Sequence, residues 1–292
     1  MCSLHSTQHN LLDTDNSKVD KNMQIISLAL FSIAICRSAL AYPTDGLKQL
    51  AARDCSAEIA TFNLARRERR GDFSRRSIYP TMKNLTCILA PEASTDNYIA
   101  NPPLRQDVTQ GQTQVFLIGC VNSFTDGLCI SFSGFALTMD IGVLDVTTCQ
   151  PLPNAMVEIW SPNALGNYGT FLRGALTTAS NGIAEFQTIF PGYTSEGANH
   201  INLLVHTSSS ATSSVTHAGR VFFTDKWTTI VAMQPPYNTN THERITNLDD
   251  PVYAAAGKTG FYPVIDVASI HDDWPEGMVG YITVGVNPKA TH

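Results

Sequence analysis

Residues 137–160 decide the fold, and they read LTMDIGVLDVTTCQPLPNAMVEIW. Apolar residues alternate with other residues in both halves of this stretch, at Leu137, Met139, Ile141, Val143, Ala155, Val157 and Ile159. A period of two is typical of a strand with one buried face. Turn-forming residues at Pro151–Asn154 separate the two halves. The stretch therefore predicts two strands joined by a turn.

The same alternation continues downstream, at Ile201, Leu203 and Val205. Further turn signals separate the apolar runs, at Gly166-Asn167, Asn181-Gly182 and Pro191-Gly192. Several short strands at this spacing predict a mainly β protein, an antiparallel β-sandwich.

One short helix is expected upstream of the strands, over residues 45–70. Its apolar side is predicted to contain Ile59, Phe62 and Ala65. A basic cluster at its end favours the helix dipole and is interpreted as a solvated helix end: Arg66, Arg67, Arg69 and Arg70.

Composition excludes several classes of protein. Of 292 residues 43% are hydrophobic and 15% are charged, which is enough apolar material for a core and argues against disorder. The formal net charge is -6 at pH 7 and the pI is about 5.7. Such a chain has no broad basic face, so we expect no nucleic-acid partner.

The N-terminal part predicts export. Lys18 and Lys21 precede an apolar run over residues 25–35, and Ala39-Leu40-Ala41 is a small-x-small cleavage pattern. A membrane anchor is the alternative, but the run is shorter than the roughly 20 residues needed to span a bilayer. Residues 23–41 are therefore expected to be a signal peptide, and residues 1–22 an extension of the gene model before a start at Met23. The mature protein is expected to be extracellular, beginning near Tyr42, with no membrane association.

Cysteines and a glycosylation sequon agree with export. Five cysteines follow the expected cleavage site, so at least one is unpaired, and their connectivity cannot be deduced from the sequence: Cys55, Cys87, Cys120, Cys129 and Cys149. Asn84 begins an Asn-Leu-Thr sequon. No cysteine spacing indicates a zinc site.

Three residues that could bind a metal follow the strands and turns. Tyr168 and Tyr193 each stand beside glycine-bearing turns, and His200 opens an apolar strand. Taken singly, each has a structural interpretation, as an exposed turn tyrosine or a hydrogen-bonded strand histidine. Together, two phenolates and an imidazole form a donor set that prefers a hard trivalent metal, above all Fe(III).

An ordered series of motifs supports this interpretation. It comprises Asp145, Cys149 and Pro151, then Asn154, Val157, Ile159 and Trp160, the Gly-x-Tyr turn at Tyr168, Arg173-Gly174, Asn181-Gly182 and Phe190-Pro191-Gly192, with Pro91-Glu92 and Leu104-Arg105 before and Gly219–Phe223 and Pro236-Tyr237 after. The series resembles the secreted fungal branch of the intradiol ring-cleavage dioxygenases over most of residues 85–285.

The resemblance implies a fold, a cofactor and a reaction. The fold would be a transthyretin-like (prealbumin-like) β-sandwich over residues 85–290, after an N-terminal helical segment at 42–84. The cofactor would be a non-haem Fe(III), and the reaction would open a catechol-type ring with O₂, in aromatic compound catabolism. Tyr168 would be the retained phenolate ligand, Tyr193 the displaceable one that acts as a base, and His200 an imidazole ligand. The protein would be a monomer or a loose dimer, because the chain offers one short N-terminal helix.

The chain departs from the family pattern around the site. The family has His-x-His where this chain has His200-Ile201-Asn202, so Asn202 takes the place of the fourth ligand, and an amide is a weak neutral donor. His206 lies on the same strand face, but its backbone would be roughly 20 Å from that of His200, too far to substitute. Gly197 stands where the family has an arginine, and Arg220 where it usually has a glutamine.

Three hypotheses about function follow. The first is an active, secreted iron-dependent dioxygenase that tolerates Asn202, or recruits water or another side chain as the fourth ligand. The second is a non-catalytic sandwich that binds aromatic compounds or cell-wall material. The third, an unrelated immunoglobulin-like adhesive or carbohydrate-binding module, leaves the ordered Tyr, Tyr, His series unexplained. One segment, residues 115–135, lacks both alternation and helical period, and is expected to be a gene-model artefact or a disordered surface loop.

Overall fold

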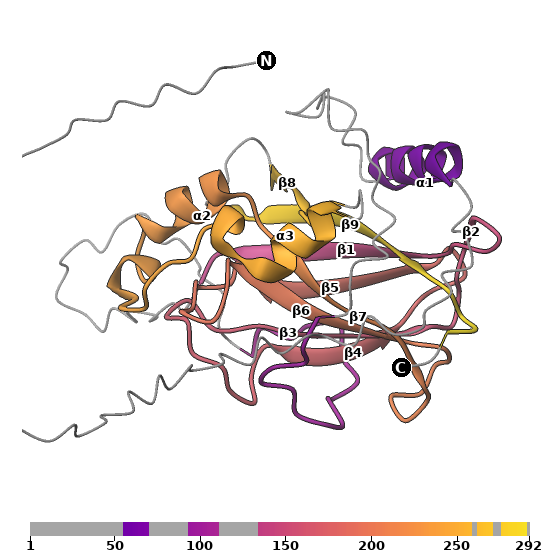
Figure 1. Ribbon diagram of the computed structural model, residues 1–292, viewed down its shortest axis with the longest axis horizontal. Coiled ribbons are helices and arrows are strands. Elements are labelled where there is room, and N and C mark those ends of the chain that lie inside the picture. The colour runs from indigo at the N-terminus through magenta and orange to yellow at the C-terminus, as the bar shows by residue number, and fades with distance from the viewer. Residues whose placement is uncertain (1–54, 70–92, 111–133, 259–261, 271–275, 291–292) are drawn as a thin grey trace, which may run out of the picture. The chain divides into compact units, whose positions relative to one another are not determined.

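The computed structural model describes residues 55–69, 93–110, 134–258, 262–270 and 276–290 (Figure 1). Two sheets contain all the strands of this part of the chain. The first sheet consists of β1 (Ala136–Asp145), β2 (Gln150–Pro151), β5 (Ile183–Ile189), β8 (Asp266–Ser269) and β9 (Met278–Val286). The second consists of β3 (Met156–Trp160), β4 (Arg173–Thr177), β6 (His200–His206) and β7 (Val215–Phe222). The predicted mainly β sandwich is confirmed.

Strand order differs between the two sheets. The second sheet runs β4-β3-β6-β7, and every pair in it is antiparallel. In the first sheet β1 is central, because it pairs antiparallel with β5 on one side and parallel with β9 on the other. Leu137 at the start of β1 lies opposite Met278 at the start of β9. The first and last long strands of the described chain are therefore neighbours.

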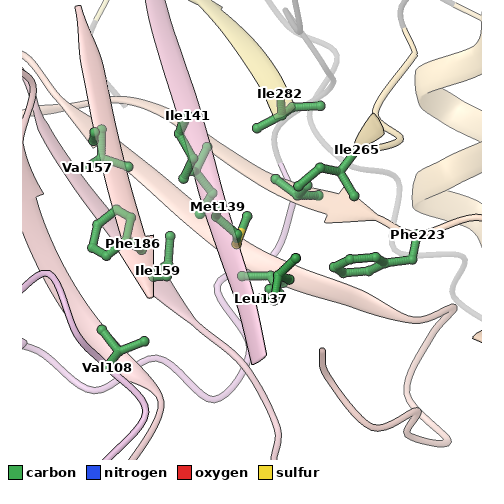
Figure 2. Packing of buried hydrophobic residues seen from close by; sticks show 14 of the residues in the cluster. Val108, Leu137, Met139, Ile141, Val157, Ile159, Phe186, Phe223, Ile265 and Ile282 are labelled. Carbon is green, nitrogen blue, oxygen red and sulfur yellow. The ribbon is translucent and has the colours of Figure 1, made fainter. Parts of the chain in front are cut away.

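The core fills the space between the sheets, and the alternating apolar residues line it. Leu137, Met139 and Ile141 of β1 point toward Val157 and Ile159 of β3 (Figure 2). All the residues predicted from the period of two are buried here, those of β6 included. Burying one face of each sheet is the main stabilising contribution in such a sandwich.

Three short helices accompany the sheets: α1 (Ser56–Arg69), α2 (Asp225–Ala232) and α3 (Pro251–Lys258). Two 3₁₀ turns lie between α2 and α3, at Tyr237–Thr239 and Asn247–Asp249. α2 begins at an N-cap, because the Thr224 hydroxyl accepts from the Trp227 backbone N–H at 3.2 Å. Among the described residues no helix has the length and apolarity to cross a membrane.

The structure of α1 differs from two expectations, which place Ala65 on its apolar side and Arg66 in a solvated helix end. A disulfide joins Cys55, just before α1, to Cys149, after β1. Ile59 and Phe62 pack beside this disulfide, as predicted, but Ala65 is exposed and Arg66 is buried in its place. The Arg66 Nη2 lies 2.6 Å from Oδ1 of Asp140 on β1. Arg66 therefore forms a buried ion pair and is not part of a solvated helix end. Ile59, Phe62 and Arg66 thus share one side of the helix at the expected helical spacing, but the last of these buried residues is a cation.

Several predictions lie outside the described residues. Residues 1–54 and Asn84 are outside the described part of the chain. The leader, signal peptide and sequon therefore stay predictions. Of the segment 115–135, only Gly134 and Phe135 are described, and Phe135 is in the core, with its ring stacked 5.6 Å from that of Tyr237.

Candidate metal centre

The predicted site residues lie on the outer face of the second sheet. Because Ile201 and Leu203 of β6 face the core, His200 and Asn202 face outward. Asn202 lies opposite Trp160 of β3 and opposite Arg220 of β7. Arg173 of β4 lies opposite Trp160. In this register Arg173, Trp160, Asn202 and Arg220 form one row across the four strands, with an arginine at each end.

This outer face is covered, so the row is buried. The segment 93–110 lies against it: the Trp160 Nε1–H donates to the Asp96 carbonyl at 2.9 Å, and the Tyr98 ring packs on Trp160 at 5.3 Å between centroids. Only 1% of Asn202 and 5% of His200 is exposed. Charges at this site are therefore weakly screened by solvent.

Asn202 is hydrogen-bonded to Tyr168. The Asn202 Nδ2 donates to the Tyr168 Oη at 3.1 Å, which connects the β6 strand with the loop before β4. Its other amide atom, Oδ1, is buried and has no hydrogen-bond partner among the described residues. Burial raises the pKa of Tyr168 to about 12, while the Asn202 hydrogen bond opposes the shift. Tyr168 is therefore a neutral phenol at pH 7.

His200 has the tautomer that a metal ligand needs. Its Nδ1 lies 2.6 Å from the Ala198 carbonyl, which can only accept, so Nδ1 holds the proton and Nε2 keeps a lone pair. Burial, followed by the Arg220 charge, lowers the pKa of His200 to about 4. Ala198, Asp250 and the Asn202 amide oppose this shift. The ring is therefore neutral at pH 7.

Tyr193 lies on a neighbouring loop and is held differently. Its hydroxyl donates to the Asn240 carbonyl at 3.2 Å, and the Asn240 side chain donates back to the Tyr193 carbonyl at 2.9 Å. The loop before it contacts the Tyr168 loop, because the Gly192 N–H donates to the Asn163 carbonyl at 3.1 Å. Tyr168, His200 and Asn202 thus form one cluster, and within the described chain no hydrogen bond joins Tyr193 to it.

Arg220 is the functional candidate that sequence reasoning did not assign a role. Its side chain reaches toward Gly197, where a Cβ would lie 3.1 Å from the Arg220 Nη1 and 2.6 Å from the Asp250 Oδ2. The position where the family pattern has an arginine is thus occupied in space by a guanidinium from β7. Alternation along β7 was the available signal, since it places residue 220 on the same face as Asn202. No local signal indicated Asp250.

His206 is not part of the cluster, as predicted. Its Nε2 lies 2.7 Å from Oε1 of Glu158, and its Nδ1 lies 2.9 Å from the Ser213 carbonyl. Both ring nitrogens are engaged at the other end of β6.

The donor atoms of the cluster fit a hard cation. A phenol oxygen, an imidazole Nε2 and an amide Oδ1 without a partner come from Tyr168, His200 and Asn202. The orphaned oxygen is the deciding observation, because a buried acceptor without a donor is costly unless something binds it. Among the described residues no group of three or more His, Cys, Asp or Glu could hold a metal, so a metal here depends on tyrosine and asparagine.

The fold is that of solved intradiol dioxygenases. The intradiol ring-cleavage dioxygenase from Tetranychus urticae has 23% sequence identity and a TM-score of 0.57, over 70% of this chain and 98% of that chain. A second dioxygenase has 22% identity and a TM-score of 0.56, over 70% and 97% of the two chains. No family model and no curated protein matches the sequence. At this identity the likeness establishes a shared fold.

Proposed function

We propose that this chain is a secreted, iron-dependent intradiol dioxygenase-like protein that opens catechol-type aromatic rings with O₂. Two independent lines support the proposal: the fold likeness to solved dioxygenases and the chemistry of the buried cluster. The observation that carries it is the unpartnered Asn202 Oδ1 beside a phenol and an imidazole with a free Nε2. Tyr168, Tyr193, His200 and Asn202 would hold the metal.

A bound Fe(III) would supply Lewis acidity and a template that orients the diol toward O₂. The chain supplies the rest. His200 is neutral in advance, so no proton has to leave Nε2 before it binds. Tyr168 must lose its proton, and the Asn202 N–H stabilises the resulting phenolate oxygen in position. Tyr193, whose hydroxyl donates to the Asn240 carbonyl, would lose that proton on binding the metal, and as the displaced phenolate it would then accept one proton from the catechol at its Oη.

Asn202 favours a second candidate function, a non-catalytic sandwich that binds aromatic compounds or cell-wall material. A neutral amide oxygen binds iron more weakly than imidazole does. The Asn202 N–H to Tyr168 hydrogen bond also holds the cluster together without metal. The two functions differ in one measurable property, because only the first requires tyrosinate bound to iron.

The visible spectrum of the purified, iron-reconstituted protein tests the proposal. Tyrosinate bound to Fe(III) gives a broad charge-transfer colour, so we expect colour in the wild type. Tyr168→Phe and His200→Ala should each abolish it, and Tyr193→Phe should shift it and impair turnover. Tyr281→Phe is the matched control, because Tyr281 lies on β9 of the other sheet and should leave the colour unchanged. Colourless wild type at full iron loading would support the binding function instead.

Export has its own test. Expressed from Met23, the protein should reach the medium with its N-terminus near Tyr42 and a glycan on Asn84. Mass spectrometry of the secreted protein, with Asn84→Gln as control, checks both features. We propose that it elutes as a monomer or a loose dimer in size-exclusion chromatography. Cytosolic retention with an intact leader would contradict the export proposal.

A further inference from the structure

Arg220 is a buried cation with an unsatisfied donor. Its Nη2 donates to the Ser94 Oγ at 3.1 Å and pairs with the Asp96 Oδ2 at 3.0 Å. The Asp96 side chain is 57% exposed, whereas only 6% of the Arg220 side chain is exposed. Its Nε is buried and has no hydrogen-bond partner in the described part of the chain. The ion-pair partner Asp96 is therefore at the surface, the buried Asp250 carboxylate lies near the guanidinium beside Gly197, and the Arg220 Nε–H is available.

The guanidinium lies beside the candidate metal centre. Arg220 is directly opposite Asn202 in the β6–β7 register, where opposing side chains are about 5 Å apart at Cβ. A ligand bound beside Asn202 would therefore lie next to Arg220.

Gly197 makes this position possible. A Cβ there would lie 3.1 Å from the Arg220 Nη1 and 2.6 Å from the Asp250 Oδ2, closer than side chains normally pack. Asp250 cannot give way easily, because it accepts backbone N–H bonds from Ala198, Val252 and Tyr253. A side chain at position 197 would therefore displace the guanidinium.

A buried guanidinium beside a cation site weakens binding of the cation alone, and it strengthens binding of an anion that bridges the two charges. Arg173, at the other end of the row, adds a second buried positive charge, and its Nε donates to the Gly169 carbonyl at 2.6 Å. Guanidinium groups bind carboxylate and phenolate oxygens with strong charge-assisted hydrogen bonds. The two buried guanidinium groups therefore favour an anionic oxygen as the ligand beside the candidate metal centre.

We propose that Arg220 is a substrate-binding residue whose guanidinium donates to an anionic oxygen of an aromatic diol. The inference rests on the proposed function, and it assigns the substrate class of that same site. Two sources of the oxygen share this chemistry, a carboxylate substituent on the ring and the ring oxygens themselves.

Titration calorimetry under anaerobic conditions, with 3,4-dihydroxybenzoate and with catechol, tests the inference. Both iron-free and iron-loaded protein are titrated, as wild type, Arg220→Gln, Arg220→Lys and the control Arg244→Gln. Arg244 is a partly exposed arginine that pairs with Asp225, so this control removes one positive charge elsewhere. Thermal unfolding verifies that each variant is folded.

If the carboxylate is the contact, Arg220→Gln weakens binding of 3,4-dihydroxybenzoate about tenfold or more in both forms and leaves catechol within about twofold. If the ring oxygens are the contact, it weakens both ligands equally, and only in the iron-loaded form. Arg220→Lys, which keeps the charge, should recover part of the loss, and Arg244→Gln should behave as wild type.

Unchanged binding of both ligands in Arg220→Gln, or no binding to the wild type in either form, overturns the inference. Gly197→Ala provides a second variant that keeps Arg220, and it should weaken the same ligand, because its Cβ crowds Nη1. Colourless iron-loaded protein would instead contradict the proposed function, while the iron-free titrations would still decide the role of Arg220.

Discussion

His206 shows how two acceptors determine the charge of one buried ring. The Glu158 carboxylate and the Ser213 carbonyl both accept hydrogen bonds, so each ring nitrogen has to donate. Burial lowers the pKa of His206, but the hydrogen bonds to Glu158 and Ser213 and the charge of Glu158 together raise it above 6.5. Tyr98 faces the same carboxylate, and burial, with Glu158, raises its own pKa to about 12. The imidazolium–carboxylate pair is thus an internal ion pair.

This pair predicts a pH-dependent stability. Because the folded-state pKa of His206 is raised, its contribution is fully present below about pH 6.5 and is lost as pH rises through the raised pKa. The difference in unfolding free energy between wild type and His206→Gln should therefore shrink as pH rises above about 6.5. Denaturant unfolding at several pH values measures it. A difference between wild type and His206→Gln that stays constant with pH would contradict the ion pair.

At the metal centre, Asn202→His should raise iron affinity by about tenfold or more, because imidazole is a stronger donor than a neutral amide. Iron competition with a chelator measures the change, and the charge-transfer colour should deepen. Asn238→His, at an exposed position, is the control for adding an imidazole. Equal iron affinity in Asn202→His and wild type would mean that residue 202 is not a ligand position.

Part of the site could be predicted from the sequence. His200 and Asn202 could be placed on one face because alternation along β6 is a local pattern. The grouping of Tyr168 with them rested on the family resemblance, since the two segments are remote in sequence. The roles of Arg220 and Asp250 could not, because they depend on packing between segments that are remote in sequence. The sequence does not indicate the space beside Gly197. From sequence alone a glycine at this position indicates a turn, and only the structure places the Arg220 guanidinium next to it.

At the scale of elements, α1 is fixed to the first sheet by one disulfide and, among the described residues, by two ion pairs. The disulfide is Cys55–Cys149, and the ion pairs are Arg66–Asp140 and Arg67–Asp266. In the buried pair, the Arg66 Nε donates to the Asp140 Oδ1 at 3.0 Å, and Nη1 donates to the Thr283 hydroxyl at 3.0 Å, so β1 and β9 both bind Arg66. Sequence reasoning put Arg66 in solvent because arginine is rarely buried without a partner, and the partner is remote in sequence.

Arg66→Ala should lower the free energy of unfolding by about 3–5 kcal/mol, because it leaves the Asp140 carboxylate buried without its cation. Arg69→Ala removes an exposed arginine from the same helix and should change stability by no more than about 0.5 kcal/mol. Denaturant unfolding of the two variants and the wild type measures both values. An equal effect of the two substitutions would show that the buried pair contributes nothing specific.

For the whole molecule, stability depends on the apolar layer between the sheets. Phe186 of β5 is fully buried in that layer (Figure 2). Phe186→Ala should lower the free energy of unfolding by about 3–5 kcal/mol, through lost apolar burial and the cavity left behind. Leu248→Ala, at a residue 86% exposed, should stay within about 0.5 kcal/mol. Thermal unfolding of both variants measures the two effects. Equal effects would mean that burial in the core between the sheets does not determine stability.

Alternation predicted which side of each strand faces the core, and the structure confirms it for β1, β3 and β6. It did not predict strand order. A period of two is the same for a strand at an edge and a strand at the centre, and for parallel and antiparallel neighbours. The pairing of β1 with β9 therefore could be recognised only in three dimensions.

That pairing has a consequence for synthesis on the ribosome. β1 leaves the exit tunnel long before β9, so during elongation one edge of β1 has no neighbour, and exposed strand edges recruit other chains. A nascent chain that stops before Met278 should therefore bind chaperones or aggregate, even if its second sheet is fully formed. β9, the last strand of the described residues, completes the pairing of β1, so the first sheet can form only after β9 has left the tunnel.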